Sequence, residues 1–192
     1  MLIKNEFQVT APVDKVWRFF GDIPQVAACL PGTELTKDLG DDKYEGRVAV
    51  RMGPVRLQFA GKADVTERDE TAKRMVVNAS GAEEKGRGQA NMVVTATLAP
   101  AGRGTKVSVT QDLQLAGAAA QYGRGMISDV SAVLMRDFAV NLAARIDRPE
   151  RGEAVTGPAA APASGFTLGM RAALMALRRV FRRFFVPYQT AS

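Results

Sequence analysis

The stretch KVSVTQDLQLAGAAAQYGRGMISDVSAVLMRDFAVNLAARIDRP, residues 106–149, decides the fold. Its first part alternates apolar and polar residues, the pattern of a strand with one buried face. Its second part, residues 118–148, spaces apolar residues three or four apart, as on one face of a helix. Because Gly117 precedes this second part and Pro149 follows it, we expect a final strand that leads into one long helix of about seven turns.

The strand pattern continues upstream of this stretch. From residue 33 to residue 117 apolar and polar residues alternate, and turn sequences such as Gly53-Pro54 separate the runs. Residues 2–9 alternate in the same way, whereas residues 12–20 and 22–29 have helix-start signals and helical spacing. The sequence therefore predicts an α+β fold, with six or seven antiparallel strands, two short helices and the long C-terminal helix.

The composition disfavours most metal and acid–base chemistry. The 192 residues contain no histidine and one cysteine, Cys29. Because histidine is the usual general base and the commonest transition-metal ligand, we expect no catalytic residue, no metal site and a binding protein instead of an enzyme. A lone cysteine in a short apolar helix is interpreted as an inert buried thiol. With no disulfide and no signal-peptide pattern, a cytoplasmic location is expected.

The C-terminal segment, residues 166–192, separates charge from apolar bulk. At about 100° per residue its large apolar side chains gather on one face of a helix and its arginines on the other. A basic amphipathic helix is typical of a membrane interface, so we expect it to bind anionic lipid on the inner face of the cell membrane, tethered by a linker at residues 149–165 that is rich in Ala, Pro and Gly. Docking on the protein itself or on a partner helix is the alternative. The residues expected at the membrane are Phe166, Met170, Leu174, Leu177, Arg178, Arg179, Phe181, Arg182, Arg183, Phe184 and Phe185.

The basic charge is concentrated in this C-terminal segment. The chain has 26 Lys and Arg against 20 Asp and Glu, a net charge of +6, and the arginines after residue 166 account for most of the excess. The preceding part is therefore nearly neutral. Since a nucleic-acid-binding domain needs a basic surface of its own, we expect no nucleic-acid partner.

Several segments resemble the G-subunit (CoxG) family of carbon monoxide dehydrogenase, which belongs to the START-like (SRPBCC) superfamily. The similarity lies in the residues VDKVW at 13–17, AACLPG at 27–32, YEG at 44–46 and GRGMISDV at 123–130, followed by Phe138, Asn141 and Leu142. It extends to about residue 147, which places one domain at residues 1–148. The resemblance implies a helix-grip fold, in which a curved antiparallel sheet wraps around the last helix and leaves an apolar cavity.

The same resemblance implies a partner, an aerobic, molybdenum-containing carbon monoxide dehydrogenase or a related hydroxylase. Such an enzyme must deliver electrons to a membrane quinone pool. We therefore expect a membrane-tethered carrier of a lipophilic ligand, an isoprenoid quinone such as menaquinone or ubiquinone, bound non-covalently. The alternatives are a membrane-recruitment or assembly factor for that enzyme with no ligand of its own, and an enzyme, since START-like relatives include cyclases and hydrolases.

Inward-facing positions of the predicted sheet and helix supply the candidate ligand pocket. Methionine suits surfaces that fit flexible apolar ligands, although ordinary core packing is the alternative. Ala96 is expected on the same wall. The adjacent Glu83 and Glu84 would face opposite sides in a strand or be solvated in a loop, and neither arrangement forms a catalytic carboxylate pair. The apolar residues expected to bind the ligand are Phe20, Val26, Leu30, Leu57, Phe59, Met75, Met92 and Met126, and the residues that would orient a polar head group are Tyr122, Gln111 and Asn141.

Overall fold

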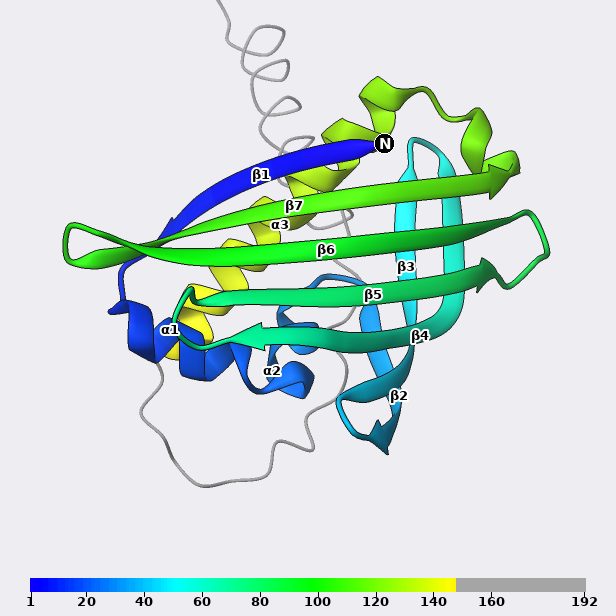
Figure 1. The fold of residues 1–192 in the computed structure, drawn as a ribbon. Helices are drawn as coiled ribbons and strands as arrows, with labels where there is room; N and C mark the ends of the chain where they lie inside the picture. Colours follow the sequence, from blue (N-terminus) through cyan, green and yellow to red (C-terminus); the bar gives the residue numbers. More distant parts are fainter. Residues whose placement is uncertain (148–192) are drawn as a thin grey trace, which may run out of the picture. The chain divides into compact units, whose positions relative to one another are not determined.

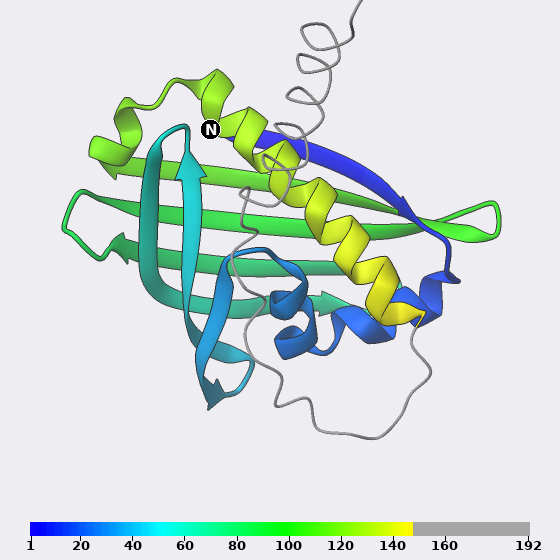
Figure 2. The ribbon, with the colours of Figure 1, turned by 180° about the vertical axis from the view of Figure 1, so that it is seen from behind.

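A computed structural model describes residues 1–147, so the predicted linker and amphipathic segment at 149–192 lie outside the described residues. The predicted α+β helix-grip architecture is confirmed: seven antiparallel strands form one curved sheet, and the long helix lies across one face of it (Figures 1 and 2). The elements in chain order are β1 (Leu2–Val9), α1 (Val13–Phe20), α2 (Ile23–Cys29), β2 (Thr33–Gly40), β3 (Lys43–Met52), β4 (Val55–Asp69), β5 (Arg74–Glu83), β6 (Gly88–Ala101), β7 (Gly104–Gly117), the short 3-10 helix η1 (Ala118–Gln121) and α3 (Arg124–Ile146).

The sheet is an antiparallel meander of β2 to β7, and the first strand, β1, adds to one edge of it. Its order is β1-β7-β6-β5-β4-β3-β2, so each strand from β2 to β7 pairs with the next one along the chain. β1 adds to the far edge beside β7, with Leu2 opposite Asp112 and Val9 opposite Thr105. Helices α1, α2 and α3 all lie on the same side of the sheet (Figure 2), and this side therefore carries the interior of the molecule.

The long helix begins later than the sequence pattern predicts. Gly117 has a φ of 72°, and a Cβ at this position would lie 2.9 Å from the carbonyl oxygen of Arg87. Glycine is suited to both the left-handed backbone and the close approach, and the chain turns there into η1. The α-helix then starts at Arg124, after Gly123, and not at residue 118 as expected.

The helices α1 and α2 pack with the C-terminal half of α3 over one half of the sheet. α1 buries Val16, Trp17 and Phe20 on one face. The ring of Phe138 from α3 makes edge-on contacts with Phe7 at 5.8 Å and Phe20 at 6.4 Å between ring centroids. Aromatic pairs in this geometry add to the stabilisation from apolar burial. This half of the molecule is a packed core.

Helix α2 bears out the interpretation of the cysteine. Its N-terminus is capped by Asp22, whose carboxylate accepts the backbone N–H of Gln25 at 3.1 Å. At its other end Cys29 is fully buried, and its thiol donates to the Gln25 carbonyl oxygen at 3.3 Å. Burial raises the pKa of the Cys29 thiol to about 11, so the thiol stays protonated and unreactive at neutral pH.

Candidate ligand-binding cavity

The other half of the interior contains a cavity of about 370 Å³. Its lining comes from all seven strands of the sheet and from the N-terminal half of α3, with Leu30 after α2 and Ala119 of η1. The contributing residues of α3 follow the spacing of a single helix face and are Ile127, Val130, Ser131, Leu134 and Met135. The same helix thus borders the cavity with its first half and packs into the core with its second half, through Phe138 and Leu142.

The space exists because the sheet carries very small residues at its centre. Gly46 on β3 lies opposite Gly61 on β4, Gly61 lies opposite Gly81 on β5, and Gly81 lies opposite Ala90 on β6. All four residues line the cavity. Protein interiors are normally filled to crystal-like density, so a row without side chains facing a helix leaves a volume that the chain itself does not occupy.

Large apolar side chains form the walls around this row. At the β3–β4 end the wall consists of Met52 and Leu57, which are both buried, together with the partly buried Phe59. Leu30 after α2 and Met92 on β6 contribute as well. Of the eleven residues expected at the ligand, the structure brings five together on this lining: Leu30, Leu57, Phe59, Met92 and Gln111.

Three expected residues belong to the packed half of the molecule instead. Phe20 and Met75 are buried members of the core formed with α1, and Val26 of α2 packs against that core. Ala96 lies directly opposite Met75 on the neighbouring strand and is buried in the same core. Phe20, Met75 and Ala96 are buried as predicted, but α1 and α2 cover this part of the sheet, so these residues pack in the core and do not line the cavity under α3.

The remaining three expected residues lie outside the cavity for separate reasons. Met126 is 43% exposed, because its neighbour Ile127 takes the inward position on α3. The side chain of Asn141 donates to the Cys29 carbonyl oxygen at 2.9 Å and so fastens α3 to α2. Tyr122, in the turn before α3, packs against the apolar cluster beside the cavity without lining it.

Several lining residues were not singled out from the sequence. Tyr44 on β3 is almost fully buried and borders the cavity, and burial is the main reason that its pKa is raised above the usual value. The small residues at positions 46, 61, 63, 79 and 81 share the inward parity of the larger wall residues. On three successive strands, β3, β4 and β5, these inward positions are Gly or Ala. This pattern is the sequence signal that could have located the cavity.

Two polar side chains meet inside this mostly apolar space. Gln111 on β7 and Ser131 on α3 are each only 8% exposed, and both line the cavity. The Ser131 hydroxyl donates to Gln111 Oε1 at 3.0 Å and accepts from the side-chain amide of Asn5 at 3.1 Å. Thr33 on β2 also borders the cavity, and its hydroxyl oxygen is buried with no hydrogen-bond partner within residues 1–147.

Glu83 is the last residue of β5 and is only 3% exposed, so it takes the strand arrangement and not the solvated one. Its carboxylate accepts from the Arg87 guanidinium at 2.8 Å and from the backbone N–H groups of Lys85 and Arg87 at 3.0 and 3.1 Å. The Arg87 guanidinium is the main reason that the pKa of Glu83 is lowered to about 2. Glu84 forms an ion pair with Arg47 at 2.9 Å. These carboxylates are structural and form no acid–base pair.

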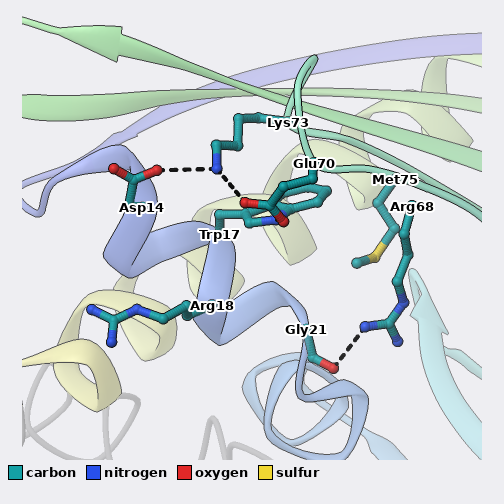
Figure 3. A pocket seen from close by; sticks show the side chains of 8 residues that line it. All are labelled: Asp14, Trp17, Arg18, Gly21, Arg68, Glu70, Lys73 and Met75. Carbon is teal, nitrogen blue, oxygen red and sulfur yellow. Dashed lines mark hydrogen bonds and ion pairs between the residues drawn. The ribbon is translucent and has the colours of Figure 1, made fainter.

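A second cleft, of about 380 Å³ between α1 and the β4–β5 turn, is lined by charged side chains that pair with one another (Figure 3). Lys73 pairs with Asp14 at 3.0 Å and with Glu70 at 2.6 Å, and its ammonium lies 5.7 Å from the ring centroid of Trp17. The indole N–H of Trp17 donates to Glu70. Since these groups satisfy one another, we assign this cleft to the attachment of the hairpin to α1 and not to a ligand.

The curved sheet, the long helix and the apolar cavity between them define the START-like, helix-grip class. Solved structures of similar fold include a conserved protein from Geobacillus kaustophilus, with a TM-score of 0.68 at 20% identity over 76% of this chain and 95% of that one. The Zhui aromatase/cyclase from Streptomyces sp. R1128 has a TM-score of 0.56 at 16% identity over 79% of this chain and 96% of that one. At these identities the similarity shows the fold alone.

The family follows from the sequence itself. The sequence profile of the family described as the G subunit of carbon monoxide dehydrogenase (CoxG) matches residues 6–147. The chain belongs to the CoxG family. A search of curated protein sequences finds no match. Within residues 1–147, no helix is both long enough and apolar enough to span a membrane.

Proposed function

We propose that this protein binds a lipophilic molecule in the cavity under α3 and serves a carbon monoxide dehydrogenase as an accessory carrier. The observation that carries the proposal is the cavity of about 370 Å³, which is bordered by one face of a helix and by a row of Gly and Ala on the sheet. Its volume lies within the range of about 300–1,000 Å³ that is usual for small-molecule sites. The mainly apolar lining favours an apolar ligand over a polar metabolite.

The proposed ligand is an isoprenoid quinone such as menaquinone or ubiquinone. The family name connects the chain with an enzyme whose substrate is oxidised, and the electrons need an acceptor. A quinone combines an apolar ring and chain with two carbonyl oxygens, which matches a lining that is apolar except for a few polar groups such as Gln111 and Thr33. The basic amphipathic segment at residues 166–192 would hold the carrier at the anionic inner membrane surface, where quinones reside.

The described residues offer little support for an enzymatic role. An aromatase/cyclase shares the fold, so the fold permits catalysis. The cavity lining, however, contains no histidine or cysteine, and its carboxylate, Glu45, pairs with Lys62 at 3.5 Å. A carrier therefore accounts for the cavity better than a catalyst does.

The experiment that tests this proposal is analysis of molecules that co-purify with the full chain. The protein is expressed in a host with quinone-containing membranes, purified without detergent, and examined by native mass spectrometry and by solvent extraction. We expect a quinone at close to one molecule per chain, and its loss from the variant Ala79→Phe, which places a ring in the cavity. A full chain that carries no lipophilic molecule and takes none from menaquinone-containing vesicles would favour the recruitment-factor alternative.

A further inference from the structure

A chain of side-chain hydrogen bonds ends at Gln111. The Ser131 hydroxyl has one proton, and its oxygen accepts the side-chain N–H of Asn5 at 3.1 Å. That proton is therefore donated to Gln111 Oε1, at 3.0 Å. The chain Asn5–Ser131–Gln111 thus crosses from β1 to α3 and then to β7, and in it Gln111 turns its carbonyl oxygen toward the serine.

The other end of the same amide is left without a partner. Gln111 Nε2 has no hydrogen-bond partner within residues 1–147, although the side chain is more than nine-tenths buried and borders the cavity. Within residues 1–147, Thr33 Oγ1 is the only fully buried side-chain N or O atom without a partner, so Gln111 Nε2 keeps access to the cavity, where a ligand oxygen can accept its hydrogen bond. Among the described lining residues Gln111 carries the only side-chain amide, whereas the hydroxyls of Thr33 and Tyr44 can both donate and accept.

We propose that Gln111 Nε2 recognises a carbonyl oxygen of the ligand and that the cavity therefore binds the oxidised quinone more tightly than the quinol. This inference rests on the proposed function. A quinone oxygen only accepts hydrogen bonds, which suits the unpaired N–H. Each quinol oxygen carries a proton that needs its own acceptor, and at Gln111 one of the two lone pairs of Oε1 is already engaged by Ser131. A carrier with this preference loads the oxidised form and releases the reduced one.

The test compares the two oxidation states of one probe, 2-methyl-1,4-naphthoquinone and its dithionite-reduced quinol, by anaerobic equilibrium dialysis against the full chain. One hydrogen bond corresponds to a preference of about three- to tenfold for the quinone. Gln111→Met keeps the side-chain length but removes the donor, so it should weaken quinone binding by that factor and abolish the preference. Ser131→Ala frees Oε1, so the amide can also accept, and the preference should shrink while quinone affinity is largely kept.

The control is Gln114→Met, because Gln114 lies on the same strand but is exposed on the opposite face. It should change neither affinity. Equal affinities of the intact chain for quinone and quinol would overturn the inference, and would leave the proposed function standing. An intact chain that binds neither form would overturn the proposed function, and the inference with it. Because the intact chain gives the decisive ratio, the test does not depend on the folding of a variant.

Discussion

Gly61 on β4 lies directly opposite Gly81 on β5, so close that a Cβ on Gly61 would lie 2.6 Å from Gly81 Cα and closer still to the Ser80 carbonyl oxygen. No residue other than glycine fits there without movement of the backbone. The pair stands in the middle of the row of small residues that leaves the cavity open. The same two residues thus permit the close approach of the strands and remove the side chains that would otherwise fill the interior.

Replacing Gly61 should therefore destabilise the protein. We expect Gly61→Ala to lower the free energy of unfolding by about 1–3 kcal/mol, because the added methyl group forces neighbouring backbone to shift. Gly125→Ala is the matched control: it lies in the first turn of α3, and a Cβ there meets nothing within 4 Å. Because alanine favours the helix, Gly125→Ala should be neutral or stabilise by up to about 1 kcal/mol. Urea unfolding followed by circular dichroism distinguishes the two outcomes.

The same substitution, Ala to Phe, should affect stability differently in the core and at the cavity. Ala79→Phe on β5 places a ring in the cavity and should leave stability nearly unchanged while it blocks ligand uptake. Ala96→Phe on the neighbouring strand overpacks the core around Met75 and should destabilise by about 1–3 kcal/mol or more. Thermal unfolding and quinone binding are measured for both. Equal destabilisation by the two variants would mean that Ala79 also faces packed core.

The Phe138 ring should be among the largest single contributors to stability. It is buried and contacts Phe7 and Phe20 edge-on. We expect Phe138→Ala to cost about 3–5 kcal/mol, because no neighbouring group can fill the space. Phe59→Ala, which removes a ring from the partly open wall of the cavity, should cost clearly less. Urea unfolding midpoints that are alike for the two variants would contradict this assignment.

Glu83 should make stability depend on pH in the acidic range. Its pKa is lowered from the ordinary 4.5 to about 2 by Arg87, so its contribution is complete above pH 4.5 and disappears as the pH falls toward 2. We expect Glu83→Gln to destabilise the protein at pH 6 and to have a much smaller effect near pH 2.5. Glu84→Gln, which removes a surface ion pair with Arg47, should have only a small effect at pH 6. A destabilisation by Glu83→Gln that does not change with pH would contradict a charge-based role.

Residues 166–192 are expected to bind the membrane, and their deletion tests this expectation. Deletion of residues 165–192 should abolish sedimentation with anionic vesicles, because it removes the arginines and phenylalanines that are expected to bind the membrane. High salt should weaken binding of the full chain only in part, since apolar burial, at about 25 cal/mol per Å², is not screened by ions. A truncated protein that sediments as well as the full chain would exclude this segment as the anchor.

The sequence by itself determined the elements and their faces. Period-two alternation located the strands, the change of period after Gly117 located the long helix, and both patterns depend only on backbone geometry and the burial of apolar side chains. The motifs around residues 13–32 and 123–130 were sufficient for the family. The alternation of side chains along each strand also predicted correctly that Leu57, Phe59 and Gln111 face inward.

Only the tertiary structure decided which part of the inner face is core and which part borders the cavity. Met75 and Met92 have the same residue type and both face inward, yet α1 and α2 cover the first and leave the second open. Two further features could not be inferred from the sequence: the pairing of the buried Glu83 with Arg87, and the chain from Asn5 through Ser131 to Gln111. Each depends on the distance between side chains from separate elements or a turn. Local patterns fix which face a residue occupies, but what lies across from it depends on how distant segments pack.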